Sequence, residues 1–348
     1  MASEDAPGHR RARAAHIGIA PALALCLACS TTPYSPGTGD RSPVPEPEPL
    51  LQHTGVPPEQ FRVDPEPITA VDAWILHAYT FFHRRDYRTY RVVYPGHLGG
   101  DTIAHLLIPP GAGPHPTVIV FPILDPGSLV VAEAAAKALV RRGYLVAWLE
   151  RPDLAFETSD RPDLPTEALS SSVRDARRLL DFLVTRDDVD AGRIGTAGIS
   201  LGAMQACLLQ AVDKRVRAGF YVLGGGGTAE LLYDSREVPV RSYRDNVLKK
   251  LQLASRDDFV AHMRPLTRAI DPAVRAPAIR PASVLVATGR FDHVIPRARA
   301  EELWEALGRP KRILLPIGHY QVLPFFWWLM ARGADHFDDV LVPQHRAP

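Results

Sequence analysis

The chain has 348 residues, of which 46% are hydrophobic and 23% are charged, an ordinary composition for a globular protein. Its 40 Lys and Arg residues nearly balance 39 Asp and Glu residues, so composition gives no indication of binding to nucleic acid or to an anionic surface. Three cysteines are too few for a disulfide framework. Cys207 lies on a helical pattern, and we expect it to be a small buried apolar residue.

The first 30 residues have the pattern of an export signal. A basic stretch, Arg10–Arg13, precedes the apolar run Ile17–Ala28, which is too short for a transmembrane helix. The run leads to Cys29, and a cysteine after a small residue resembles the lipidation site of a bacterial lipoprotein, although Cys26 replaces a branched aliphatic residue of that signal. We expect export to the periplasm, the outer surface or the medium, with or without membrane anchoring through a lipidated Cys29. The alternative is an apolar helix retained in the cytoplasm.

Residues 31–67 are rich in Pro, Gly, Ser, Thr and Glu. The stretch Pro43–Pro49 (PVPEPEP) favours an extended chain and cannot build a core. We therefore predict a disordered linker over 31–67, followed by one folded domain over 68–348 that is long enough to bury a sizeable core.

From residue 68 onward, helical and strand patterns alternate. An aromatic-rich amphipathic helix over 68–85 comes first, and two strands joined by a turn at Pro95–Gly100 follow it. Thr117–Phe121 (TVIVF) is wholly apolar, as is typical of a strand buried on both faces of a sheet. The expected strands are 88–94, 102–108, 117–121, 144–149, 193–197, 218–223, 283–288 and 312–315, and the expected helices are 132–142, 167–185, 201–211, 297–307 and 324–341.

Such an alternation predicts an α/β fold with a mostly parallel central sheet and helices on both faces. Right-handed crossovers bring the carboxyl ends of the parallel strands to one edge, where ligands bind in open α/β sheets. The segment 224–281 breaks the alternation with a glycine run and charged helical patterns. We expect a small helical lid over that edge, because insertions there commonly shape pockets. The alternative is a peripheral helical excursion without contact to substrate.

The sequence Gly198–Gly202 (GISLG) follows a predicted strand and begins a predicted helix. In this context G-x-S-x-G forms a sharp turn that holds its serine in a strained backbone conformation, and the flanking glycines avoid a clash. The hydroxyl of Ser200 then lies at the positive end of the helix. We predict Ser200 as a nucleophile and the N–H group of Leu201 as one oxyanion donor. The alternative is a structural serine in a glycine-rich turn.

A serine nucleophile needs an adjacent base, and the base needs a partner that orients it. Asp292 follows the predicted strand 283–288, and His319 follows the predicted strand 312–315. Both residues are therefore expected at the same sheet edge, in the order serine, acid, histidine. The alternatives are a helix-capping Asp292 and a surface His319, but their joint occurrence favours a triad. His293 is less suitable as the base because adjacent side chains, here those of Asp292 and His293, point apart.

With these motifs the chain resembles the α/β-hydrolase superfamily, nearest to dienelactone hydrolases, acetyl xylan esterases and the catalytic domains of prolyl-oligopeptidase-type peptidases. The resemblance implies the roles of nucleophile for Ser200, acid for Asp292 and base for His319. It runs from about Arg88 to the C-terminus, and its most specific parts are Val189–Ile194, Gly198–Gly202, Gly289–Asp292 and Gly318–His319.

One stretch departs from this superfamily. Many members carry a His-Gly pair after the third strand, and its backbone supplies the second oxyanion donor. The corresponding stretch here is Phe121–Gly127, in which Pro122 has no N–H group to donate. The alignment favours Ile123 as the donor, with Leu124 as the alternative. A carboxylate close to an oxyanion would oppose it, so we expect Asp125 to point away or to pair with an arginine.

These features predict a serine carboxylesterase that acts on a small-molecule ester through an acyl-enzyme on Ser200, with no metal or cofactor, since no His and Cys cluster has ligand spacing. One alternative is a prolyl-oligopeptidase-type peptidase, although that group usually carries a propeller and no blade repeats occur here. Another is a non-catalytic binding protein that retains the fold. We expect the aromatic cluster Phe325–Trp328 to be the buried face of the last helix, with a pocket wall as the alternative. The sequence indicates neither the acyl and alcohol groups nor the oligomeric state.

Overall fold

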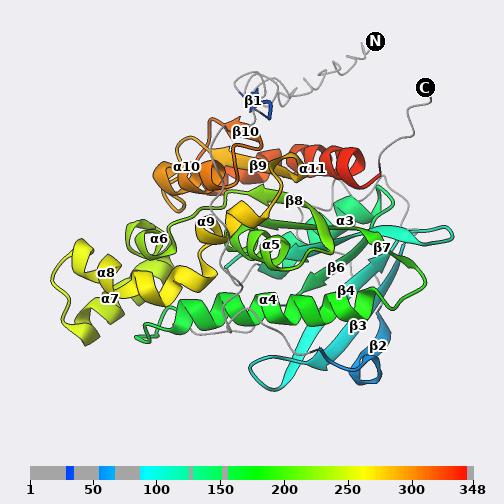
Figure 1. The fold of residues 1–348 in the computed structure, drawn as a ribbon, viewed down its shortest axis with the longest axis horizontal. Helices are drawn as coiled ribbons and strands as arrows, with labels where there is room; N and C mark the ends of the chain where they lie inside the picture. The colour runs from blue at the N-terminus through cyan, green and yellow to red at the C-terminus, as the bar shows by residue number, and fades with distance from the viewer. Residues whose placement is uncertain (1–28, 35–54, 67–86, 125–127, 151–155, 343–348) are drawn as a thin grey trace, which may run out of the picture.

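The computed structural model describes residues 29–34, 55–66, 87–124, 128–150 and 156–342 (Figure 1). Nearly all of the predicted leader over 1–30, and the whole predicted helix over 68–85, lie outside these ranges. Among the residues that the structure describes, no helix is both long enough and apolar enough to span a bilayer.

The described strands form one sheet in the order β1-β10-β9-β8-β7-β5-β6-β4-β3-β2. Strands β6, β5, β7, β8, β9 and β10 pair in parallel, whereas the pairs at both outer ends of the sheet are antiparallel. This arrangement confirms the predicted α/β class with a mostly parallel sheet. The strands are β1 Ser30–Thr32, β2 Arg62–Glu66, β3 Arg88–Pro95, β4 Asp101–Ile108, β5 His115–Phe121, β6 Leu145–Leu149, β7 Val189–Ile199, β8 Val216–Val222, β9 Val284–Gly289 and β10 Lys311–Leu315.

Helices cover both faces of the sheet (Figure 1). On one face, α3 Ser128–Val140 and α11 Phe326–Leu341 pack their apolar side chains against the sheet. On the other face lie α4 Leu164–Leu183, α5 Leu201–Val212 and α10 Arg297–Ala306. The central strands β6 and β9 are buried throughout because helices cover them on both sides, which explains why their sequences are apolar without alternation.

Strand β2 and most of β1 lie within the segment that composition predicts to be a disordered linker, and Ser30 of β1 belongs to the predicted leader. Strand β2 pairs antiparallel with β3, and the preceding Phe61 is buried, with its ring stacked on Tyr94 at 4.9 Å and on Phe182 at 4.6 Å. Strand β1 pairs antiparallel with β10. The linker prediction for 31–67 is therefore wrong for these residues. Pro65 does not prevent the pairing, because an edge strand tolerates a residue without an N–H group.

The segment 224–281 is helical, as predicted. It forms α6 Thr228–Asp234, α7 Val238–Leu251, α8 Arg256–Thr267 and α9 Pro272–Arg275. The first three of these helices share a core of their own that includes Leu232, Tyr243 and Phe259. In Figure 1 they stand together at one end of the molecule, beyond α4 and α5.

The last helix begins later than predicted. Residues Tyr320–Phe325 form a 3-10 segment, and α11 starts at Phe326. Phe325 and Phe326 are buried, and the two tryptophans that follow pack against the core from partly buried positions. The aromatic cluster is thus mainly a buried helix face, as expected, although Phe326 also borders the cavity described below.

Candidate active site

Ser200 stands in a strained turn between β7 and α5. Its φ of 57° and ψ of −122° lie outside the regions that side-chain-bearing residues commonly adopt. The turn is so tight that a Cβ atom on Gly198 would lie 2.1 Å from the carbonyl oxygen of Gly202, and one on Gly202 would lie 2.6 Å from that of Phe121. The backbone N–H of Ser200 donates to the carbonyl of Val222 at 2.8 Å, which fixes the turn against β8.

Three side chains predicted from separate segments meet at this turn. The Nε2 atom of His319 lies 3.0 Å from Ser200 Oγ, and its Nδ1 atom lies 2.8 Å from Asp292 Oδ2. An ionised carboxylate only accepts hydrogen bonds, so Nδ1 carries the proton and Nε2 is free to accept one from the serine hydroxyl. The structure therefore brings Ser200, His319 and Asp292 into one hydrogen-bonded chain.

The carboxylate of Asp292 is held at both oxygens. While Oδ2 faces the histidine, Oδ1 accepts hydrogen bonds from the backbone N–H groups of Val294 and Ile295, each at 2.8 Å. The residue is only 5% exposed. These contacts leave the carboxylate one orientation, and that orientation fixes the imidazole ring of His319 in turn.

Backbone hydrogen bonds join the loops that carry the acid and the histidine. The N–H of Arg290 donates to the carbonyl of Leu315 at 2.8 Å, and that of Phe291 donates to the carbonyl of Ile317 at 3.0 Å. The two loops extend from the adjacent parallel strands β9 and β10. Their separation is therefore set by the sheet itself, and no surface contact is needed to hold it.

The residues predicted as oxyanion donors border the same space. Leu201 begins α5, where backbone N–H groups have no partner within the helix. Ile123 and Leu124 follow β5 and border the cavity that adjoins Ser200. Asp125 lies outside the described residues. His293 is exposed and does not border the cavity, in line with its rejection as the base.

A cavity of about 330 Å³ adjoins Ser200 and His319. Its walls come from α3, α4 and α5, from the segment 224–281 and from the loops after β5, β9 and β10, and most of the side chains are apolar. Residues of α6 and α7 border it, as a lid over this edge of the sheet would. The polar residues at its border are Ser200, Gln205, Thr228, Ser235, Glu237, His319 and Tyr320.

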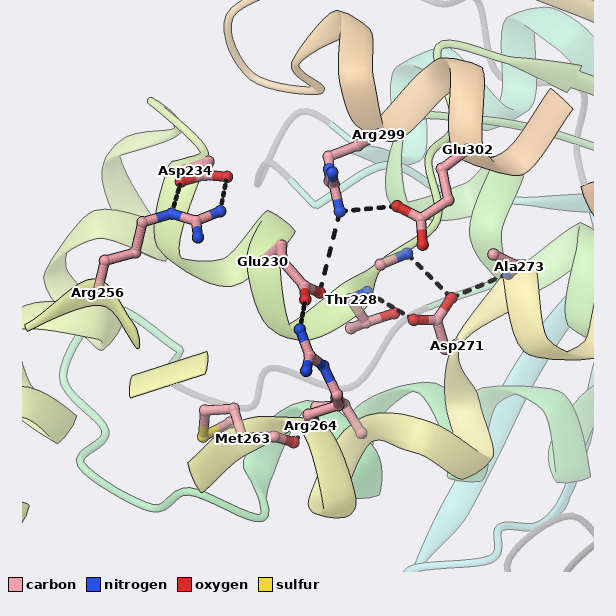
Figure 2. A network of polar contacts seen from close by, with 12 residues as sticks. Thr228, Glu230, Asp234, Arg256, Met263, Arg264, Asp271, Ala273, Arg299 and Glu302 are labelled. Carbon is pink, nitrogen blue, oxygen red and sulfur yellow. Dashed lines mark hydrogen bonds and ion pairs between the residues drawn. The ribbon is translucent and has the colours of Figure 1, made fainter. Parts of the chain in front are cut away.

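A polar network holds α6 in place as one wall of this cavity (Figure 2). The carboxylate of Asp271 accepts hydrogen bonds from the backbone N–H groups of Gly227, Thr228 and Ala273 at 3.1, 2.8 and 2.9 Å. Burial raises the pKa of Asp271 against the lowering effect of these three donors. The hydrogen bonds leave the N-terminus of α6 little freedom to move.

Ion pairs fix α6 on the side away from its buried leucines. Glu230 pairs with Arg264 of α8 and Asp234 pairs with Arg256, whose Nη2 lies 2.7 Å from the carboxylate (Figure 2). Burial acts to raise the pKa of Glu230, but the hydrogen bond from Arg264, a backbone hydrogen bond and the charges of Arg264 and Arg299 together outweigh it, and the pKa lies below its usual value. The Nη1 atom of Arg299 on α10 lies 3.9 Å from the carboxylate of Glu230, so the helix is held between α8 and α10.

Sequence reasoning missed a contact across the mouth of the cavity. The hydroxyl of Tyr320 donates to Glu237 Oε2 at 2.5 Å, so the loop after the histidine touches the start of α7. No motif marks either residue. The sequence pattern gives a weak indication of which α5 residues border the cavity. Met204 and Gln205 follow Leu201 by three and four residues, the spacing of one helical face.

Within the described ranges, no three His, Cys, Asp or Glu side chains are grouped so that they could hold a metal ion.

No family model matches the chain, and no curated protein matches it. Among solved structures, it is similar to an acetyl xylan esterase from Paenibacillus sp. R4, with a TM-score of 0.60 and 18% identity over 79% of this chain and 88% of that one. It is also similar to acetyl xylan esterase 1 from Thermoanaerobacterium sp. JW/SL YS485, with a TM-score of 0.57 and 17% identity over 83% and 96%.

A third similar structure is a puromycin hydrolase, with a TM-score of 0.53 and 15% identity over 74% of this chain and 40% of that protein. At such low identities the likeness is one of fold. The chemistry of the site must therefore be argued from its own side chains.

Proposed function

The chain has the α/β-hydrolase fold, and from the hydrogen-bonded chain within it we propose a serine hydrolase that cleaves carboxylic esters through an acyl-enzyme on Ser200. The observation that carries this proposal is the path from Asp292 through His319 to Ser200, with distances of 2.8 and 3.0 Å, beside a cavity. A serine hydroxyl is a weak nucleophile until a base at this distance removes its proton.

In the first half of the reaction, Ser200 Oγ attacks the ester carbonyl carbon while His319 Nε2 takes the hydroxyl proton. The imidazolium that forms is stabilised by the carboxylate of Asp292, which stays ionised. Negative charge moves to the former carbonyl oxygen. We assign the N–H groups of Leu201 and Ile123 as its hydrogen-bond donors. Loss of one such donor typically costs roughly a hundredfold or more in rate.

In the second half, the tetrahedral intermediate collapses and the bond between the carbonyl carbon and the alcohol oxygen breaks. His319 Nε2 gives its proton to the leaving alcohol. Water then attacks the acyl group on Ser200, with His319 again accepting a proton, and release of the acid restores the serine hydroxyl. The atoms balance without any metal or redox group.

The names of the similar structures suggest two substrate classes. Acetylated xylan is one, but the mostly apolar walls beside Ser200 offer few hydrogen-bond partners to a sugar. An amide is the other, since a serine with the same partners also attacks amides. We favour the ester because its alcohol leaves more readily, and an anilide of the same acid separates the two classes.

The test is reaction of the purified full chain with a fluorophosphonate probe, beside hydrolysis of p-nitrophenyl acetate and of acetyl p-nitroanilide. Ser200→Ala should abolish labelling and ester hydrolysis, while Ser170→Ala, a buried serine of α4 that does not border the cavity, should keep both. Faster cleavage of the anilide than of the ester would favour a peptidase. Absence of labelling in folded wild type would contradict the proposal and favour a binding protein.

From the sequence pattern of residues 1–30 we also propose that the chain is exported. Lipidation at Cys29 is the specific form to test, because this cysteine follows a small residue, Ala28, at the end of the apolar run. Cells expressing the full chain are labelled with palmitate, beside Cys29→Ser. Label on the wild type alone supports an anchor, and export without label supports a secreted form. Retention of both variants in the cytoplasm contradicts export.

A further inference from the structure

The cavity beside Ser200 is much larger than an acetyl group. An apolar cavity of about 150 Å³ holds a benzene molecule, so the volume of about 330 Å³ accommodates roughly ten non-hydrogen atoms. An acetyl group would leave most of this space without contacts to the substrate. The volume therefore favours a larger acyl or alcohol group.

The walls show what chemistry that group has. Ala168 and Leu169 of α4, Met204 of α5, and Leu231 and Leu232 of α6 all border the cavity, and each is at most 8% exposed. These side chains offer dispersion contacts and no hydrogen bonds. A sugar or a charged group placed against them would lose its hydration without compensation.

The polar side chains at the border change this little. Ser235 and Glu237 are engaged, since Ser235 Oγ accepts from the N–H of Glu237 and Glu237 accepts from Tyr320. The Oε1 atom of Gln205 and the Oγ1 atom of Thr228 are buried and have no hydrogen-bond partner among the described residues. Neither oxygen brings a charge to the cavity, so its walls stay mostly apolar.

The cavity reaches the surface next to His319. Tyr320 and Leu323 border it and are 59% and 57% exposed. An apolar chain can therefore enter from solvent beside the reacting serine, and its far end lies against α4 and α6. Because Asp271 and the ion pairs hold α6, this wall is present before any substrate binds.

We propose that the acyl group of the substrate occupies this cavity, so that the preferred substrates are esters of a medium-length apolar acid, of roughly six to ten carbons by the cavity volume, and not acetyl esters. This inference depends on the proposed hydrolase function and adds the substrate class to it. Each methylene group buried in the cavity should raise kcat/KM by about fourfold, until the cavity is full.

The test is the kcat/KM of the full chain for p-nitrophenyl esters from acetate to dodecanoate. Octanoate carries six methylene groups more than acetate, so wild type should favour octanoate, by up to roughly 4000-fold if all six are buried. Val131→Trp, which fills part of the cavity from α3, should lower kcat/KM for octanoate more than for acetate and so move the optimum to a shorter chain. Val130→Trp is the matched control, because Val130 is 39% exposed and does not border the cavity. Ala168→Phe fills the cavity from α4, in case Val131→Trp fails to fold.

A second measurement separates this inference from the hydrolase function. Calorimetry with Ser200→Ala, which cannot form an acyl-enzyme, should show that p-nitrophenyl octanoate binds more tightly than the acetate, with a negative heat capacity change. If Ser200→Ala binds the octanoate tightly but fluorophosphonate does not label the folded wild type, the hydrolase function is contradicted and the assignment of the cavity to an apolar chain still holds. The proposed preference for a medium-length acid would be overturned if labelled wild type hydrolysed acetate best. It would also be overturned if neither cavity-filling variant changed the dependence of kcat/KM on chain length.

Discussion

Replacing Asp292 with asparagine changes one atom of the proposed triad and tests how that atom is used. The oxygen Oδ1 accepts hydrogen bonds from the N–H groups of Val294 and Ile295, each at 2.8 Å. The asparagine oxygen must stay at this position, since an amide N–H₂ there would face two donors, and each unsatisfied donor costs about 1–3 kcal/mol. The amide nitrogen is therefore forced to face His319.

That orientation reverses the histidine tautomer. The amide nitrogen would stand where Oδ2 lies now, 2.8 Å from His319 Nδ1, and an amide nitrogen only donates. The Nδ1 atom must then accept, so the ring proton moves to Nε2, which faces Ser200 Oγ at 3.0 Å. A protonated Nε2 cannot remove the serine proton. The expected loss in kcat is roughly 10⁴-fold, about 5.5 kcal/mol of transition-state stabilisation.

The assay is steady-state hydrolysis of a p-nitrophenyl ester by Asp292→Asn, beside the melting temperature. The melting temperature should change little, because the asparagine keeps both backbone hydrogen bonds. Asp64→Asn is the control, since Asp64 is exposed on β2, does not border the cavity and should keep the activity. A kcat for Asp292→Asn within tenfold of wild type would refute the assignment of Asp292 as the orienting acid.

Three further substitutions test how the fold is held. Asp271→Ala removes the acceptor of three backbone N–H groups and should lower the free energy of unfolding by about 3 kcal/mol, measured by urea denaturation; an unchanged midpoint would contradict the anchoring role. Gln205→Met should be neutral or stabilising by up to about 1 kcal/mol, because it removes a buried oxygen without a partner; a clear loss of stability in the same assay would reveal an overlooked contact. Burial lowers the pKa of His105, but hydrogen bonds to Glu150 and Glu66 outweigh it, so the net pKa is raised above 6.5. The stabilisation of the folded state by protonated His105 is fully present below about pH 6.5 and is lost as the pH rises through the folded pKa. The melting temperature of wild type relative to that of His105→Gln should therefore fall over this range, and a pH-independent difference would contradict the raised pKa of His105.

The parts of the site that sequence could predict are those fixed by local geometry. The turn at Ser200 requires glycines at set positions, and Asp292 and His319 each follow an apolar strand closely. Parallel strands end at one edge, so residues at the ends of β7, β9 and β10 are brought together by topology alone. The distances observed between the three side chains agree with that reasoning.

The parts that sequence missed depend on contacts between distant segments. Strands β1 and β2 form because the edges of the sheet offer partners, and nothing in a proline-rich composition reports those partners. The cavity likewise results from the packing of α6 against α4 and α5, which Asp271 and three ion pairs hold in register. Helical patterns predicted that the segment 224–281 is helical, but they could not predict which of its faces would border the site.

The most direct measurement is mass spectrometry of the full chain after reaction with a fluorophosphonate, with peptide mapping of the adduct. An activated nucleophile predicts one adduct for each chain, on Ser200, and a rate of formation that falls steeply in His319→Gln. An adduct on another residue would contradict the account, and so would an equal rate of labelling in wild type and His319→Gln, because Ser200 would then react without the base that the geometry assigns to it.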